Sequence, residues 1–397
     1  MKNQLNKYLC GNDLINELTV LPEYREDVIE IPDRLLALLD IYKIFIPTRS
    51  VLDIYNRLYL SLLSSLDKKS TKEEIVVLNE NFKASKGLKR YGIIGGLESF
   101  KITGTAGLGK TSSVQRCIDV ITSNNLIIMD NPYREIIPIL FVECVADGSF
   151  KSLLFMILKE VDNTIGSDYF EANNKTTITI DILLSVVSKV LITHVALLVI
   201  DEIERVANDS KRGDTLINYL TQLVNQSNIA ICFVGNESAN KYFETKEYMS
   251  RRTIGISIKK MDYDEAFYNF CETLFKYQYV NNKIEFTAEY SRLFYRLSNG
   301  IPSMVVSLFV ETQREAIISG VECLSVSLFE EVFKNNFSNM HPYIDLEKKT
   351  INKRKIIEEK PIIDDEVSDR LFVNQLNNND ISVVVMNLRN WIEVDIA

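Results

Sequence analysis

The sequence predicts an α/β fold in which helices cover both faces of a parallel β-sheet. Between residues 97 and 260, short apolar runs alternate with segments of helical periodicity. The runs read SFKITG, IIPILFVECV, VALLVID, NIAICFVG and TIGISI. Parallel strands need a crossover connection, usually a helix, so this alternation is typical of a parallel sheet. After residue 262 the apolar spacing becomes helical, which predicts a small helical region beside the sheet.

The pattern divides the chain into four regions. Residues 1–96 form an N-terminal arm and helical extension, in which 48–66 places apolar side chains at helical spacing. Residues 97–260 form the α/β core, and 261–345 form a helical lid. Residues 346–397 are a C-terminal tail, which we expect to bind partners.

Composition limits the classes of protein that the chain can represent. Its 397 residues are 46% hydrophobic and 25% charged, which is typical of a globular protein with a substantial core. No apolar run approaches the roughly 18 residues of a membrane span, and the start lacks the apolar region of a signal peptide. Six singly spaced cysteines and two histidines make a zinc site improbable, and the chain reads as cytoplasmic. The net charge of −9 argues against general nucleic-acid binding but permits a local basic surface.

The stretch KITGTAGLGKTSS carries the pattern of a phosphate-binding loop, G-x-x-x-x-G-K-[ST]. It follows an apolar strand and opens a helical segment, so a chance glycine-rich turn is the weaker interpretation. Backbone N–H groups of such a loop point at phosphates, and the helix N-terminus adds partial positive charge. Lys110 would reach the β- and γ-phosphates, and the Thr111 hydroxyl would bind Mg²⁺. The predicted nucleotide-binding residues are Gly104, Thr105, Ala106, Gly107, Leu108, Gly109, Lys110, Thr111 and Ser112.

A second motif, VALLVIDEIERV, is an apolar run that ends in two acids. Such a run suits a central parallel strand, and its carboxyl end lies where ligands bind in these sheets. Asp201 would hold Mg²⁺, and Glu202 would polarise the attacking water. The alternative is a strand that merely ends in solvated acids. Beside a phosphate-binding loop, the acid pair indicates a hydrolysing ATPase.

Two further positions complete the predicted catalytic set. Asn236 follows the run IAICFVG, where an amide can bridge the γ-phosphate and the water; a plain Gly-Asn turn is the alternative. Arg251 and Arg252 precede the last run, where ring-forming P-loop ATPases place an arginine that reaches a neighbour's site. A pair of surface arginines is the alternative there. No N-K-x-D motif lies in a suitable place, so ATP is favoured over GTP as the nucleotide.

Together, these features resemble the AAA+ superfamily, in its initiator-like branch. They are the phosphate-binding loop (Walker A), the strand that ends in the acid pair (Walker B), the asparagine, the arginine pair and the helical lid. More narrowly, the chain resembles the TnsC family, the ATP-dependent target-selection regulators of multi-subunit transposons, with TniB proteins as relatives. The resemblance covers roughly residues 30–350 and includes IPDRLLALLDIYKIFIPTRSVLDIYNRLY, VECVADGSFKSLL, LLVIDEIERV, RLSNGIPSMVVSLFVETQREAI and MHPYIDLEK. Two features depart from it. The tail is shorter than in the best-known members, and Ser303 stands where many AAA+ proteins carry a sensor arginine, so no second sensor is assigned.

This resemblance implies a homo-oligomeric ring or filament on double-stranded DNA. It also implies a target-site selector that signals to the protein, and transposase subunits that the protein recruits, with ATP hydrolysis as the switch. The selector could be a sequence-specific DNA-binding protein or an RNA-guided complex. Candidate DNA contacts are Lys151, Lys175 and Thr176, with Thr177 beside them, although solvated loop side chains would look the same.

Two other functions compete with this one. An origin- or repair-type AAA+ loader would also hydrolyse ATP, and the N-terminal and lid resemblances argue against it. A nucleotide-gated scaffold would bind ATP without significant turnover, and the intact Glu202 argues against that.

Overall fold

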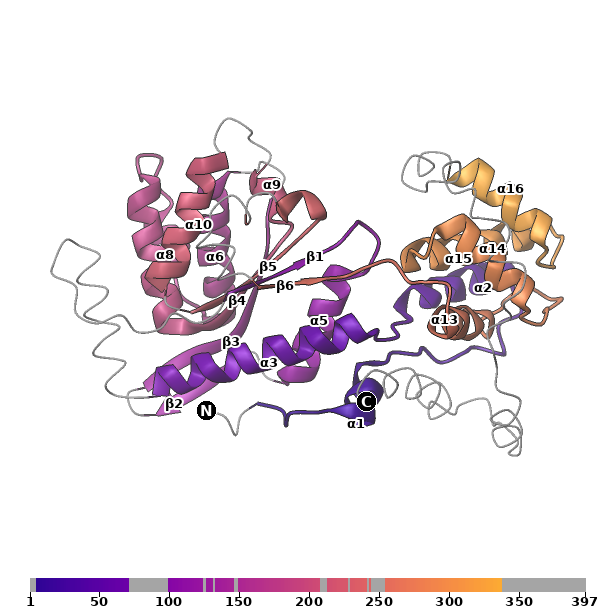
Figure 1. Cartoon of the computed structure of the whole chain (residues 1–397), viewed down its shortest axis with the longest axis horizontal. Coiled ribbons are helices and arrows are strands. Elements are labelled where there is room, and N and C mark those ends of the chain that lie inside the picture. The colour runs from indigo at the N-terminus through magenta and orange to yellow at the C-terminus, as the bar shows by residue number, and fades with distance from the viewer. Residues whose placement is uncertain are drawn as a thin grey trace. The chain divides into compact units, whose positions relative to one another are not determined.

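A computed structural model describes residues 5–70, 99–123, 126–130, 133–145, 149–207, 213–227, 229–240, 243 and 254–337. The chain forms two compact units (Figure 1). The first takes its described residues from Met1–Tyr8, Thr48–Ala106 and Lys110–Ile258. The second takes them from Leu9–Pro47, Gly107–Gly109 and Lys259–Ala397.

A six-stranded sheet in the order β2-β3-β4-β5-β1-β6 is the centre of the first unit. Five strands run parallel, and β2 pairs antiparallel with β3. The strands are β1 (Phe100–Thr103), β2 (Ile127–Asp130), β3 (Tyr133–Glu143), β4 (Val195–Asp201), β5 (Ala230–Gly235) and β6 (Ile254–Ser257). The predicted parallel α/β sheet is therefore confirmed, with an antiparallel edge strand that the sequence pattern did not reveal.

Burial explains why these runs form strands. Every residue of β4 and of β5 is buried, as expected for central strands with helices on both faces. Strand β1 lies beside β5, with Phe100 opposite Cys232 and Thr103 opposite Gly235. The carboxyl ends of β1, β5 and β4 consequently meet at one edge of the sheet.

Helices cover both faces of this sheet. Figure 1 shows α3 (Arg49–Ser70) and α5 (Lys110–Ile121) on one face, and α6 (Phe150–Ile165), α8 (Ile180–His194) and α10 (Gly213–Ser227) on the other. The helix expected over 48–66 is confirmed as α3, which buries its apolar stripe, including Tyr55, Leu58 and Leu62. The short elements α7 (Tyr169–Asn173), α9 (Glu204–Ala207) and η3 (Glu237–Ala239) lie in the connections.

The C-terminal end of α3 carries a buried lysine. Lys69 is 3% exposed, and its ammonium donates hydrogen bonds to the carbonyl oxygens of Leu191 and Ile192 in the last turn of α8. The Leu191 carbonyl also accepts the backbone N–H of Val195, the residue after α8. Lys69 therefore adds a donor from a neighbouring element at the C-terminal end of α8.

The second unit is helical and combines residues from the N-terminal and C-terminal parts of the sequence. Its elements are α1 (Gly11–Leu18), α2 (Ile31–Ala37), η2 (Leu38–Lys43), α13 (Glu265–Phe275), α14 (Ala288–Ser298), α15 (Pro302–Ile318) and α16 (Val326–Asn336). Phe275, Phe294 and Phe309 pack their rings at its centre. Arg34 of α2 forms a two-armed ion pair with Glu322, with both N–O distances at 2.8 Å.

Within the described ranges, no single helix has the length and hydropathy of a membrane span. The pair α14 and α15 passes that test only together, with a bend of 115° between the two helices.

Candidate functional site

The predicted site residues of the sheet gather where three neighbouring strands end. Lys110 and Thr111 begin α5 shortly after β1, Asp201 ends β4, and Asn236 follows β5, which lies between β1 and β4. A parallel sheet thus brings together Lys110 and Asn236, which are 126 positions apart in the sequence. This edge is the usual ligand-binding position in open α/β sheets.

The backbone of the glycine-rich loop takes the shape that its sequence predicts. Gly107 and Gly109 have φ angles of 82° and 76°, in the left-handed region that favours glycine. The Lys110 ammonium donates hydrogen bonds to the carbonyl oxygens of Gly104, at 2.9 Å, and Thr105, at 3.0 Å. The lysine thus closes over the start of the loop, beside the buried Thr105 hydroxyl, which has no hydrogen-bond partner among the described residues.

Negative charges around Lys110 oppose part of the effect that burial has on the pKa of its ammonium. Burial lowers the pKa of the Lys110 ammonium, and four carboxylates oppose that shift. In order of their effect they are Glu204, Asp201, Glu202 and Glu237. The acids at the ends of β4 and β5 therefore offset part of the effect of burial on this group.

Thr111 and Asp201 lie in direct contact. The Thr111 hydroxyl donates a 2.6 Å hydrogen bond to Oδ2 of Asp201, whose residue is 1% exposed. The other carboxylate oxygen accepts the backbone N–H of Glu202 at 2.8 Å, which fixes the side chain. Mg²⁺ prefers oxygen ligands of this kind, usually one or two from the protein with the rest from water and phosphate. The hydroxyl, the carboxylate and the orphaned Thr105 hydroxyl therefore fit a magnesium–nucleotide complex.

Glu202 adopts a constrained position beside Asp201. Its φ of 53° is unusual for a residue other than glycine. Its carboxylate pairs with Arg205, which also donates hydrogen bonds to Oε1 of Glu143 at 3.1 Å and to the carbonyl of Cys144 at 2.8 Å. Burial raises the pKa of the Glu202 carboxyl, and Arg205 opposes that rise. The guanidinium thus holds Glu202 toward the end of β3, on the side of β4 that faces away from β5 and β1.

Asn236 caps the short helix that follows β5. Its side-chain oxygen accepts the backbone N–H of Ser238 at 2.9 Å and the Ser238 hydroxyl at 2.5 Å. Its own N–H donates to Oε2 of Glu204 at 3.2 Å. The turn around Asn236 is therefore fixed on both sides.

The candidate DNA contacts lie in the first turn of α6 and between α7 and α8. Arg251 and Arg252 lie outside the described residues. Lys151 begins α6, with its ammonium 5.8 Å from the centre of the Phe155 ring. Lys175, Thr176 and Thr177 are exposed in the turn between α7 and α8.

Two charged residues at the site escaped the sequence prediction. Arg205 and Glu204 both lie on α9, directly after the predicted acid pair. The spacing of Glu202 and Arg205, three residues apart, was a signal for an ion pair on a helical turn. For Glu204 the sequence held no signal, because its contact with Asn236 depends on the pairing of β4 with β5.

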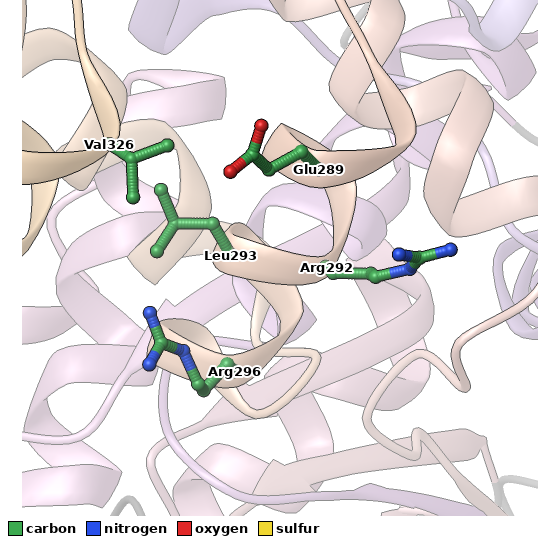
Figure 2. A pocket seen from close by; sticks show the side chains of 5 residues that line it. All are labelled: Glu289, Arg292, Leu293, Arg296 and Val326. Atoms are coloured by element: carbon green, nitrogen blue, oxygen red, sulfur yellow. The ribbon is translucent and has the colours of Figure 1, made fainter. Parts of the chain in front are cut away.

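A surface pocket lies elsewhere, between α14 and α16 of the second unit. Figure 2 shows its lining side chains, with Arg292 and Arg296 extending in opposite directions from α14. Arg296 is paired with Glu330 of α16. None of the predicted site residues lines this pocket.

Comparison with known proteins agrees with this geometry. Residues 97–243 match the AAA domain family. This match spans the phosphate-binding loop, the acid pair and Asn236. With the strand order, it gives the chain the fold of an AAA+ P-loop ATPase. No curated protein matches the chain.

Several solved structures are similar to this chain over two thirds or more of its length. Drosophila ORC bound to DNA is 13% identical, with a TM-score of 0.45, over 80% of this chain and 71% of that one. Aeropyrum pernix ORC2 in its ADP form is 13% identical, with a TM-score of 0.40, over 75% and 80%. Domain III of the Thermotoga maritima replication initiation protein DnaA is 12% identical, with a TM-score of 0.36, over 67% and 92%.

Proposed function

We propose that this protein binds ATP with Mg²⁺ at the ends of β1, β4 and β5 and hydrolyses it to ADP and phosphate. The contact between Thr111 and Asp201 carries the proposal, because it joins the phosphate-binding loop to the acid pair as a ready magnesium site. Magnesium would neutralise charge on the β- and γ-phosphates when bound there. The loop amides and Lys110 bind and orient the phosphates.

Hydrolysis needs a carboxylate that can turn toward the nucleotide. Glu202 has the position in sequence of that group, next to the magnesium ligand Asp201. Its pairing with Arg205 would have to loosen before it could polarise a water molecule. Asn236 would orient the same water from the end of β5. Arg251 or Arg252 of a neighbouring subunit would supply the remaining positive charge.

The biological role that we propose is the regulation of DNA transposition. In it, ATP-bound subunits assemble on duplex DNA, receive a signal from a target-site selector and recruit the transposase, and hydrolysis resets the assembly. The resemblance of residues 30–350 to the TnsC family supports this role. Lys151, Lys175 and Thr176 are the candidate DNA contacts, and a cytoplasmic location is part of the same proposal.

Turnover measurements on the purified chain test the proposal. We expect ATP hydrolysis that duplex DNA stimulates, and loss of ATP affinity by roughly 10- to 100-fold in Lys110→Ala, because a charged hydrogen-bond donor to phosphate disappears. Lys159→Ala, which removes an exposed lysine of α6, is the matched control and should behave as the parent. Equal ATP binding by the parent and Lys110→Ala would contradict the nucleotide site. If neither turnover nor assembly depended on DNA, the role in transposition would be contradicted, but the nucleotide site would not.

A further inference from the structure

The segment that follows the acid pair is fastened to the end of β5 by two hydrogen bonds. The N–H of Ile203 donates to the carbonyl of Val234 at 3.1 Å, and Oε2 of Glu204 accepts the N–H of Asn236 at 3.2 Å. The first bond joins the turn after β4 to a residue near the end of β5. The second uses a side chain to hold the backbone at the residue predicted to orient water.

Space at this point is restricted. A Cβ atom placed on Gly235 would lie 2.6 Å from Oε2 of Glu204 and 2.9 Å from Cγ2 of Ile203. A glycine therefore allows the carboxylate to approach the backbone of β5. The Glu204 carboxylate lies where the Cβ atom of any other residue at position 235 would be.

The two glutamates after Asp201 are directed to opposite sides of β4. Arg205 holds Glu202 toward Glu143 and Cys144 at the end of β3. Glu204 faces β5, and of the four carboxylates around the Lys110 ammonium it acts on that group most strongly. Glu204 therefore stands between the phosphate-binding lysine and the asparagine at the end of β5.

We propose that Glu204 is a positioning residue for hydrolysis, which holds Asn236 in place for the attacking water through the hydrogen bond to its backbone N–H. This inference rests on the proposed ATPase function. Because the hydrogen bond fixes the turn, loss of the acceptor should misplace Asn236 while the phosphate-binding loop stays intact. Glu204 also places negative charge near the phosphates, so its removal should leave ATP affinity unchanged or increase it.

Two substitutions separate these effects. Glu204→Ala removes the acceptor and the charge, and we expect kcat to fall about 10- to 100-fold, as for a misplaced catalytic group, with ATP bound at least as tightly as by the parent. Glu204→Gln keeps an acceptor oxygen for Asn236 and should retain kcat close to the parental value. The measurements are single-turnover hydrolysis, equilibrium binding of a fluorescent ATP analogue, and the midpoint of thermal unfolding.

Glu171→Ala, which removes an exposed glutamate of α7, is the matched control. It should keep the parental kcat. Gly235→Ala adds a second route to the same change by pushing the Glu204 carboxylate away. Because a Cβ at this position would also lie 2.9 Å from Cγ2 of Ile203, Gly235→Ala should lower kcat at least as much as Glu204→Ala.

Several outcomes would overturn the inference. Parental kcat in Glu204→Ala would show that Asn236 needs no such support. A loss of kcat, ATP affinity and thermal stability together would mean a purely structural role, and a Glu204→Gln variant as slow as Glu204→Ala would mean that the charge acts, not the hydrogen bond. A parent that neither binds nor hydrolyses ATP would remove the proposed function itself, and this inference with it.

Discussion

The hydroxyl of Thr111 and the carboxylate of Asp201 are 2.6 Å apart, although 90 residues of sequence separate them. Thr111 lies in the first turn of α5 and Asp201 at the buried end of β4, with β5 between β4 and β1. Each residue is a weak indication of a metal site by itself. Their contact brings together, at the N-terminus of α5, the two oxygens that would hold Mg²⁺ in the proposed site.

Thr111→Ala should weaken magnesium binding at the nucleotide site. We expect the Mg²⁺ concentration for half-maximal hydrolysis to rise roughly tenfold or more, because a ligand oxygen is lost. Thr111→Ser keeps the hydroxyl and is the control, with a magnesium dependence close to the parent. Titration of Mg²⁺ at saturating ATP measures both. Identical curves for Thr111→Ala and the parent would show that this hydroxyl holds no metal.

Glu202→Gln should separate binding from turnover. The amide keeps the shape of the carboxylate but cannot polarise water, so ATP should bind and persist while hydrolysis falls by about 100-fold or more. Filter binding with labelled ATP and release of phosphate provide the two measurements. Turnover at the parental rate would assign catalysis to another carboxylate.

The arginine pair tests whether hydrolysis requires a neighbouring subunit. We expect turnover per subunit to rise with protein concentration and with DNA, since an arginine supplied by a neighbour can contribute about 10³- to 10⁵-fold in rate. Replacing Arg251 and Arg252 by alanine should remove that rise while isolated subunits still bind ATP. Mixing this variant with Lys110→Ala should restore part of the activity, because each subunit supplies what the other lacks. Co-assembly without recovery would place the arginines in their own subunit's site or in a structural role.

Arg34→Met tests the link between the two ends of the chain within the second unit. Arg34 and Glu322 are buried to 6% and 16% side-chain exposure, and Arg34 also donates to the carbonyl of Tyr279 at 3.1 Å. The substitution leaves the half-buried Glu322 carboxylate without its ion-pair partner, so we expect the free energy of unfolding to fall by roughly 2 kcal/mol. The double variant Arg34→Met/Glu322→Gln should recover part of that loss. Denaturant unfolding measures each variant, and an unchanged midpoint for Arg34→Met would contradict a stabilising pair.

Lys69 should make stability depend on pH. Burial lowers the pKa of its ammonium to about 7, far below the ordinary value. Above pH 7 the unfolded chain therefore holds one proton more at this site than the folded chain. Stability from this site rises with pH there, by up to about 1.4 kcal/mol per pH unit.

Buried thiols act in the opposite direction, so the comparison must be made against a variant. Burial raises the pKa of Cys117, Cys144, Cys232 and Cys271, and their contribution to stability falls as pH rises through the ordinary thiol range. Both proteins share this effect, and it cancels in the difference between the parent and Lys69→Met. The unfolding free energy of the parent minus that of Lys69→Met should increase between pH 7 and 8.5. A constant difference would mean that Lys69 stays charged in the folded protein through its bonds to the α8 carbonyls.

The sequence by itself predicted most strands of the sheet and the position of the glycine-rich loop. Continuous apolar runs predicted central strands, as β4 and β5 confirm, because a strand covered on both faces has no polar side. The loop from Gly104 to Thr111 was identified by spacing, since its function depends on glycine φ angles and on neighbouring residues. For these features the interacting groups lie close together along the chain.

Only the tertiary structure decided which distant residues meet. The order of strands brings Thr111 to Asp201 and Glu204 to Asn236, and no local pattern encodes that order. The antiparallel pairing of β2 with β3 and the ion pair of Arg34 with Glu322 also have no local sequence pattern that predicts them. Residues 9–47, which the sequence pattern left as an irregular arm, share a compact unit with the C-terminal helices. The removal of apolar surface from water stabilises any pair of elements whose surfaces fit, whatever their separation in sequence. A single sequence shows the periodicity of each element but not which elements pack together.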